Sequence, residues 1–272
     1  MPTVTISGVE LAHRVTGRAD GSPALFIHGY TGNLRNWSLQ VKALVGTGQY
    51  RCLSADNPGH GESGAPDDAR NYEFDRVADL LHQLAIETSF APAIVFGHSM
   101  GGAIAEQYAI RYPEHVSALV LVGSAGGASG PERIGMAAPA EALRTAYAEG
   151  GMGAVYDARQ KLTPTPGYDT LPEATKTFLR SEFMRTHWNG FEFGGRALYT
   201  RAETLTALAR FDKPTLIMHG AAESDALQRV ASDLTRTIHD ARRVVVPGAG
   251  HSPQFENPTA FNGEVLAFLA TL

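Results

Sequence analysis

The chain has 272 residues, of which 43% are hydrophobic and 19% are charged, so it is long enough to bury a large core. A formal charge of −5 without runs of like charge argues against nucleic acid or an anionic membrane as the main partner. The single cysteine excludes an internal disulfide, and no apolar stretch approaches the roughly 18 residues that a membrane-spanning helix needs.

The amino-terminal segment MPTVTISGVE has neither the basic start nor the apolar core of a signal peptide. We therefore expect a cytoplasmic protein that acts on a small molecule, and association into a homo-oligomer is left open. The sequence contains no P-loop, no H-E-x-x-H and no paired-cysteine spacing. We accordingly expect neither a cofactor nor a metal.

Six short apolar runs recur along the chain and are typical of buried strands. Because these runs are continuous rather than alternating, they indicate a parallel sheet that is covered on both faces. Residues 74–88 and 258–272 instead have apolar side chains at helical spacing. The pattern predicts an α/β fold with a doubly wound, mostly parallel sheet. In chain order, the six runs are PALFIHG, RCLSAD, APAIVFG, VSALVLVG, PTLIMHG and ARRVVVPG.

The alternation of strands and helices stops between about Ala125 and Arg210, where the pattern is helical with glycine interruptions. We interpret this segment as a helical cap inserted into the fold. The predicted organisation is therefore a core domain of residues 1–124 and 211–272, with a cap of residues 125–210.

The sequence G-H-S-M-G at 97–101 follows a predicted strand and precedes a predicted helix. This matches G-x-S-x-G, in which the strand turns so sharply into the helix that the serine hydroxyl is exposed at the turn. Ser99 is therefore the candidate nucleophile. The alternative is a glycine-rich turn with an idle serine, and the strand before it and the helix after it argue against that.

A serine hydroxyl needs a neighbouring base, usually histidine, to become nucleophilic. His251 follows the last predicted strand on a glycine-flanked loop, and active sites of open α/β sheets collect at the carboxyl ends of the strands. His28 and His219 also close strands, and like His98 they could simply be packed histidines. His251 is the candidate base.

Acyl transfer also needs hydrogen-bond donors for the developing oxyanion. An early strand ends in the loop H-G-Y-T-G at 28–32, which could direct the backbone amide of Tyr30 at the serine. The amide of Met100, the residue after the nucleophile, is the second candidate donor.

These motifs occur in the order found in the α/β-hydrolase superfamily: the HG-x-x-G loop, then DNPGHGES, the GHSMG turn, a cap and a late GAGH. The chain resembles that superfamily over nearly its whole length, and within it the serine esterases and lactonases. The resemblance implies that Ser99 is the nucleophile, that His251 is the base, and that a carboxylate follows the PTLIMHG strand.

Two residues compete for the role of that acid. The family places it third after the strand-closing glycine, which is Glu223, whereas the usual residue type is aspartate, which favours Asp225. Glutamate is an accepted triad acid. We therefore predict Glu223, with Asp225 as the alternative, and we expect Asp225 otherwise to cap the helix that follows.

The candidate substrate-binding residues are Tyr30 and His98 beside the turn, with Phe183 and Trp188 from the cap. The cap is rich in aromatic residues that could line an apolar pocket or form the cap's own core. Its methionines, Met136, Met152 and Met184, also suit a moderately sized apolar group. The aromatic residues of the cap are Tyr147, Tyr156, Tyr168, Phe178, Phe183, Trp188, Phe191, Phe193 and Tyr199.

The favoured function is hydrolysis of a carboxylic ester or lactone through a Ser-His-acid triad and an acyl-enzyme. Hydrolases that cut carbon–carbon bonds of ring-fission products share the S-M-G-G sequence, but they usually carry tryptophan after the catalytic histidine, where this chain has Ser252. That reaction is the alternative. A ligand receptor of the same fold is a further alternative, because fold alone does not exclude it.

Overall fold

The computed structural model describes residues 1–127, 140–162 and 173–272. Its strands are β1 (Thr3–Ile6), β2 (Val9–Gly17), β3 (Ser22–Ile27), β4 (Tyr50–Ala55), β5 (Ala93–His98), β6 (Val116–Val122), β7 (Thr215–Gly220) and β8 (Ala241–Val246). Its α-helices are α1 (Ser38–Gly46), α2 (Phe74–Glu87), α3 (Met100–Arg111), α4 (Ala140–Leu162), α5 (Glu173–Phe183), α6 (Trp188–Thr200), α7 (Leu205–Leu208), α8 (Asp225–Thr237), α9 (Pro253–Glu256) and α10 (Pro258–Leu269). Short 3₁₀ helices are η1 (Leu34–Trp37), η2 (Ala69–Tyr72) and η3 (Pro113–His115).

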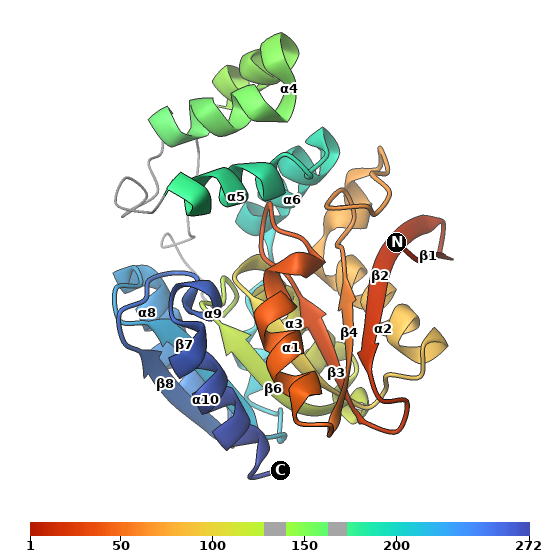
Figure 1. Cartoon of the computed structure of the whole chain (residues 1–272), viewed down its shortest axis with the longest axis vertical. Coiled ribbons are helices and arrows are strands. Elements are labelled where there is room, and N and C mark those ends of the chain that lie inside the picture. Colours follow the sequence, from red (N-terminus) through yellow and green to blue (C-terminus); the bar gives the residue numbers. More distant parts are fainter. Residues whose placement is uncertain (128–139, 163–172) are drawn as a thin grey trace.

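The eight strands form one sheet in the order β1-β2-β4-β3-β5-β6-β7-β8 (Figure 1). All neighbouring pairs from β4 to β8 are parallel, whereas β2 runs antiparallel to both β1 and β4. The six predicted strands and the two predicted helices are confirmed, and so is the doubly wound, mostly parallel sheet. The β1–β2 hairpin was not predicted.

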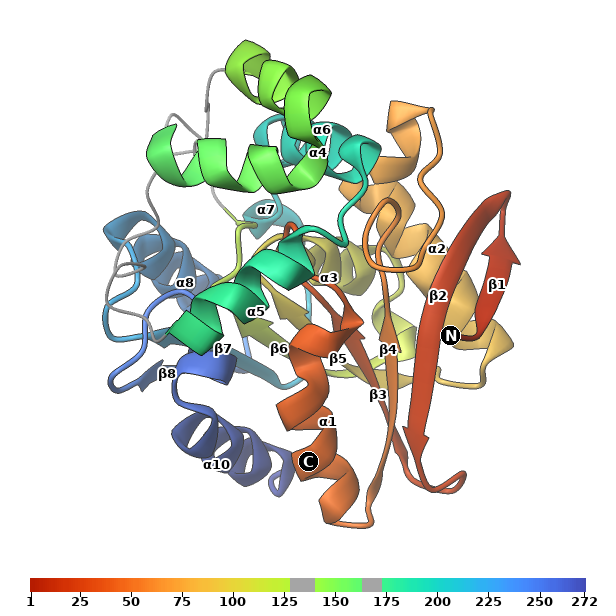
Figure 2. The ribbon, with the colours of Figure 1, turned by 45° about the horizontal axis from the view of Figure 1, so that its top comes forward.

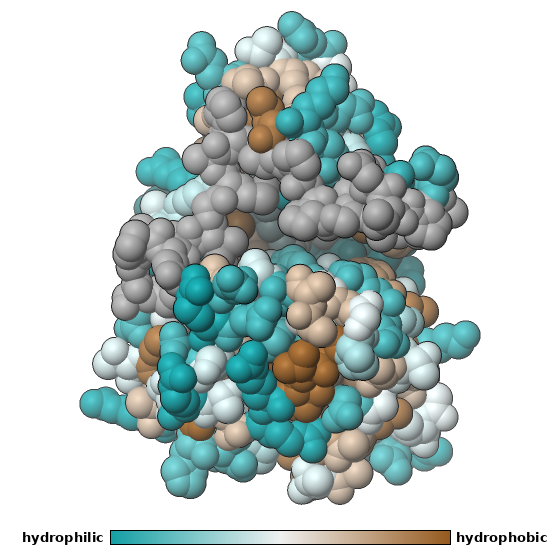
Figure 3. Space-filling view, turned by 90° about the vertical axis from the view of Figure 1, so that its left-hand side faces the viewer, coloured by the Kyte–Doolittle hydropathy of each residue, from teal (hydrophilic) through white to brown (hydrophobic). Residues whose placement is uncertain are grey.

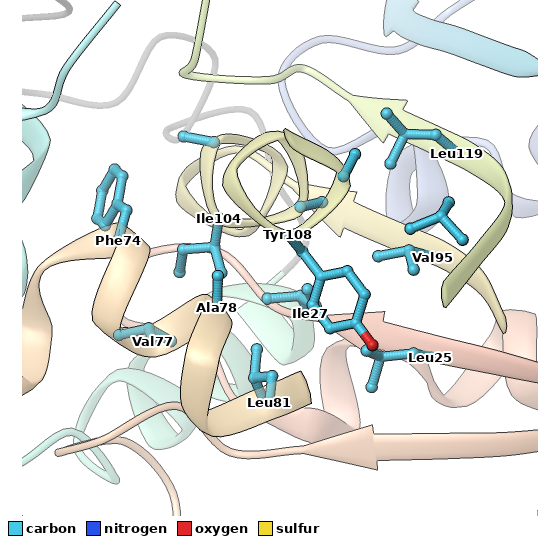
Figure 4. Close-up of a cluster of buried hydrophobic side chains, with 14 of the residues drawn as sticks. Leu25, Ile27, Phe74, Val77, Ala78, Leu81, Val95, Ile104, Tyr108 and Leu119 are labelled. Atoms are coloured by element: carbon cyan, nitrogen blue, oxygen red, sulfur yellow. The ribbon is translucent and has the colours of Figure 1, made fainter. Parts of the chain in front are cut away.

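Helices cover both faces of the sheet because successive side chains of a buried strand point to opposite sides. Leu25 and Ile27 of β3 pack on the face covered by α2, α3 and α8, while Ala24 and Phe26 pack on the face covered by α1 and α10. Figure 4 shows side chains of α2 and α3 meeting those of β3, β5 and β6 on the first face. This rigid core fixes the strand ends that carry the candidate site.

The helices α4, α5, α6 and α7 lie between β6 and β7 in the chain. Figures 1 and 2 show α4, α5 and α6 stacked at one end of the sheet, with α4 farthest from it. The Tyr30 hydroxyl, on the loop after β3, donates to the backbone oxygen of Phe191 in α6. This helical insertion therefore lies over the carboxyl ends of the strands. No described helix, in the insertion or elsewhere, is long and apolar enough to cross a membrane.

Strand β8 forms one edge of the sheet. Figure 3 shows the face that carries α8, β8 and α10, which is largely hydrophilic apart from a compact hydrophobic patch. Arg242 of β8 lies 3.9 Å from Glu264 of α10, and Val245 is about half exposed. Charged side chains on an edge strand disfavour pairing with the strands of other molecules.

A buried carboxylate connects both ends of the insertion to α3. Glu106 accepts hydrogen bonds from the Ser124 hydroxyl (2.6 Å) and the Gly127 amide (2.9 Å), just after β6, and from the Thr204 hydroxyl, just before α7. Burial raises the pKa of the Glu106 carboxyl above its ordinary value, although these donors oppose the shift. Glu106 therefore holds together the points where the chain leaves and rejoins the core.

Replacing Glu106 should destabilise the protein more than replacing an exposed glutamate nearby. Glu106→Ala leaves the Ser124 and Thr204 hydroxyls without their buried acceptor, while the Gly127 amide keeps its bond to the Thr204 hydroxyl, so we expect the free energy of unfolding to fall by about 2–4 kcal/mol. Glu114→Ala, at an exposed position in η3, is the control and should change it by less than about 0.5 kcal/mol. Urea denaturation measures both, and equal effects would contradict the role given to Glu106.

Candidate active site

Ser99 stands in a strained turn between β5 and α3. Its φ and ψ angles are 54° and −116°, a conformation that is costly for a residue with a Cβ atom. The turn is tight enough that a Cβ atom on Gly97 would lie 2.3 Å from the Gly101 oxygen, and one on Gly101 would lie 2.3 Å from the Ile27 oxygen. Only glycine fits at these two positions, which explains the G-x-S-x-G spacing.

Three side chains from separate strand ends form a continuous chain of hydrogen bonds. The Oγ atom of Ser99 lies 2.9 Å from Nε2 of His251, and Nδ1 of His251 lies 2.7 Å from Oε2 of Glu223. With Nδ1–H donating to the carboxylate, Nε2 has a free lone pair that can accept the serine proton. The backbone of Gly123 packs against this pair, since a Cβ atom there would lie 3.2 Å from both Glu223 Oε2 and His251 Nδ1.

Glu223 is suited to remain ionised although its side chain is only 3% exposed. Burial raises the pKa of its carboxyl, but the hydrogen bond and charge of His251 and the Ser224 amide outweigh burial and leave the pKa below its ordinary value. A Glu223 carboxylate can therefore orient the imidazole and stabilise its cation.

The alternative acid, Asp225, is exposed at the first position of α8 and has no hydrogen bond to His251. The prediction that Asp225 caps α8 is wrong. The N-cap is Ser224, whose hydroxyl accepts from the Leu227 amide. The helix begins one residue earlier than expected, so the capping position moves back by one residue.

The loop after β3 lies directly against the turn at Ser99. A Cβ atom on Gly29 would lie 3.0 Å from Nδ1 of His98 and 3.3 Å from the Ser99 Cβ. Within the described residues, the backbone amides of Tyr30 and Met100 have no hydrogen-bond acceptor. Both amides thus remain candidates for the oxyanion donors that the sequence predicts.

Three further histidines surround the site but make bonds to backbone groups. Nε2 of His98 lies 2.9 Å from the carbonyl oxygen of His251, so His98 contacts the backbone of the candidate base. His28 accepts from the Asn57 amide, and His60 accepts from the Thr31 amide. Burial lowers the pKa of His60 to about 4 and, together with the nearby His251, that of His98 to about 3. These histidines are therefore neutral near pH 7.

The two candidate cap residues pack differently. Phe183 is 3% exposed and belongs to a small core within the insertion, together with Tyr156 and Phe191. Trp188 is half-buried, stacks on Tyr147 and donates to the Glu192 carboxylate at 2.8 Å. Their role in substrate binding stays a prediction.

Two of the cap residues that were expected to suit an apolar group, Tyr168 and Met136, lie outside the described residues. Across residues 1–127, 140–162 and 173–272, no group of three or more His, Cys, Asp or Glu side chains is arranged to hold a metal ion.

Residues 23–258 match the family model of the alpha/beta hydrolase fold. The chain belongs to the alpha/beta hydrolase fold family. This membership confirms the superfamily, the fold class and the hydrolase that the sequence predicted.

The hydrolase is similar to proteins that are named for different reactions. A Bacillus subtilis (strain 168) protein assigned as a 2-succinyl-6-hydroxy-2,4-cyclohexadiene-1-carboxylate synthase is 25% identical over 99% of this chain and 98% of its own. Lipase 1 of Psychrobacter immobilis is 28% identical over 92% of this chain and 77% of the lipase. The crystal structure of the enol-lactonase from Burkholderia xenovorans LB400 is 25% identical with a TM-score of 0.83, covering 99% of this chain and 100% of that one.

The buried His60 predicts how stability depends on pH. Its folded-state pKa of about 4 lies below the ordinary 6.5, so its contribution to stability is complete above about pH 6.5 and is lost as the pH falls toward 4. The free energy of unfolding should fall by up to about 1.4 kcal/mol per pH unit, because the unfolded state binds one more proton than the folded state in this range. The stability difference between the wild type and His60→Gln, measured by urea denaturation, should shrink over this range. A difference independent of pH would contradict the assignment.

Proposed function

We propose that this hydrolase cleaves a carboxylic ester or a lactone of a moderately apolar small molecule. Ser99 would act as nucleophile, His251 as general base and Glu223 as the acid that orients it. The observation that carries this proposal is the hydrogen-bond chain from Ser99 Oγ to His251 Nε2 at 2.9 Å and from His251 Nδ1 to Glu223 Oε2 at 2.7 Å. That geometry supports proton transfer from the hydroxyl to a neutral imidazole.

In the proposed reaction, Ser99 Oγ attacks the carbonyl carbon while its proton passes to His251 Nε2. The amides of Tyr30 and Met100 donate to the oxyanion of the tetrahedral intermediate. Collapse of this intermediate expels the alcohol, which takes the proton from His251, and leaves an acyl group on the serine. Water then attacks the acyl carbon while His251 takes its proton. The bond from the acyl carbon to Ser99 Oγ breaks, the carboxylic acid leaves and His251 returns the proton to Oγ.

The proposed substrate class draws on the relatives and on the insertion. The enol-lactonase and the lipase are named for reactions at carboxylic ester bonds. We propose that residues 125–210 are a cap over a core domain of residues 1–124 and 211–272. The position of α6 supports a cap at this place, because Phe191 of α6 stacks on Tyr30, whose amide is one of the proposed oxyanion donors. Aromatic side chains packed beside that amide favour a substrate of low polarity.

Ser99 should react with a fluorophosphonate, because such reagents phosphonylate serines that a base activates. We expect one label per chain in the wild type and none in Ser99→Ala, measured by intact-protein mass spectrometry. Circular dichroism of the Ser99→Ala protein checks that it is folded. A label that persists in Ser99→Ala would remove this serine from the mechanism.

Glu223 and Asp225 offer a matched pair of substitutions, each removing one carboxylate charge near the start of α8. Glu223→Gln should lower kcat by about 10³–10⁴-fold, because the imidazole loses its orientation and its cation loses its counter-charge. Asp225→Asn should keep kcat and cost only about 0.3–1 kcal/mol, the value of a negative charge in the first turn of a helix. Steady-state kinetics and thermal denaturation separate the two effects. An inactive Asp225→Asn with an active Glu223→Gln would reverse the assignment.

The proposed substrate class can be tested with a series of p-nitrophenyl esters. kcat/KM should rise with the apolar length of the acyl group until the pocket is filled, because each buried methylene contributes binding energy. Lactones and a ring-fission dienoate belong in the same panel. A preference for charged acyl groups would contradict the apolar class, and faster turnover of the dienoate than of every ester and lactone would favour carbon–carbon hydrolysis. A protein that binds these compounds without multiple turnover would favour a receptor.

A further inference from the structure

The loop that carries His251 is held by a carboxylate that takes no part in the proposed reaction. Glu256 is the last residue of α9. Its Oε2 accepts from the Gly250 amide at 2.6 Å, and its Oε1 accepts from the Ser252 amide at 2.8 Å. The Glu256 amide in turn donates to the Ser252 oxygen at 3.0 Å, which closes the turn. The two amides bound by Glu256 are those on either side of His251.

The carbonyl group of His251 itself forms a third hydrogen bond, with His98. Nε2 of His98 lies 2.9 Å from the His251 carbonyl oxygen, and His98 directly precedes Ser99 in the chain. Because His98 is buried and neutral, its Nε2–H can donate this bond. Thus the residue before His251 and the residue after it are bonded to the exposed Glu256 carboxylate, and the carbonyl group of His251 is bonded to the buried His98.

These attachments matter because packing alone does not immobilise His251. Its side chain is 43% exposed. The Gly250 oxygen accepts from the Gly220 amide at 3.2 Å, but glycines at 248 and 250 restrict the backbone less than other residues would. Proton transfer from Ser99 requires that Nε2 stay within hydrogen-bond reach of Oγ. A displacement of about 1 Å at a reacting group costs on the order of 100-fold in rate.

We propose that Glu256 is a positioning residue for His251 and acts through the Gly250 and Ser252 amides. The hydrogen bond from His98 to the His251 carbonyl oxygen holds the same loop. This inference rests on the proposed function, in which His251 is the base. Glu256 does not compete with Glu223 for the role of triad acid, because its oxygens are bound to backbone amides while Nδ1 of His251 is bound to Glu223. Glu256 therefore acts on the rate only through the position of the imidazole.

The test is kcat per titrated active site with p-nitrophenyl acetate. Glu256→Ala removes both attachments, and we expect kcat to fall by about 10- to 100-fold while KM changes less than about twofold. Glu256→Gln keeps the size of the side chain and one acceptor oxygen, so it should show a smaller loss. Glu264→Ala removes an exposed carboxylate of the neighbouring helix and is the matched control. Titration to completion with a fluorophosphonate corrects for misfolded protein.

The His251→Ala background distinguishes this role from a general effect on the fold. If Glu256 acts only through His251, adding Glu256→Ala to His251→Ala should leave the residual rate unchanged. If Glu256→Ala lowers the rate equally in the wild type and in the His251→Ala protein, the positioning role is overturned. It is also overturned if Glu256→Ala keeps the wild-type kcat although His251→Ala abolishes turnover. Wild-type turnover in His251→Ala would instead overturn the proposed function on which the inference rests.

Discussion

The architecture of the candidate site depends on one strained residue. Ser99 holds a positive φ angle that costs on the order of 1–3 kcal/mol for a residue other than glycine. The neighbouring strand and loop maintain it, because the Ser99 amide donates to the Val122 oxygen at 2.9 Å and the Ser99 oxygen accepts from the Ala125 amide at 3.0 Å. The strain turns the hydroxyl out of the sheet, where a substrate and a base can reach it.

Parallel strands bring the other groups to the same place. Strands β3, β5, β7 and β8 are parallel, so their carboxyl ends lie at the same end of the sheet. The residues that follow these strands therefore meet although they are far apart in the chain. The proposed oxyanion loop follows β3, the proposed acid follows β7 and the proposed base follows β8. Gly123, after β6, completes this arrangement by leaving room for the Glu223–His251 pair.

The sequence predicted the parallel strands because their apolar runs are continuous, as burial on both faces requires. It missed the β1–β2 hairpin, whose strands are half-exposed and separated only by the turn at Ser7 and Gly8. The position of Glu223 came from the family pattern rather than from geometry. Asp225 was misassigned as a cap because the boundary of α8 lies one residue earlier, and such boundaries depend on hydrogen bonds that a pattern does not reveal.

The bonds that hold the site in place were harder to predict than the groups that would react. Glu256 and His98 contact backbone atoms, so no pairing of side-chain types in the sequence indicates them. Nor can a sequence decide whether an aromatic residue lines a pocket or fills a core. Phe183 is an example: it packs in the small core of the insertion, and its role in substrate binding stays a prediction.

The central claim is that turnover passes through an acyl group on Ser99. Acid quenching during hydrolysis of p-nitrophenyl butyrate, followed by peptide mass spectrometry, measures this directly. The account predicts that a butyryl group accumulates on the peptide containing Ser99 and disappears when the ester is exhausted. Full turnover with no acylated peptide at any quench time, or with the acyl group on a different residue, would contradict it.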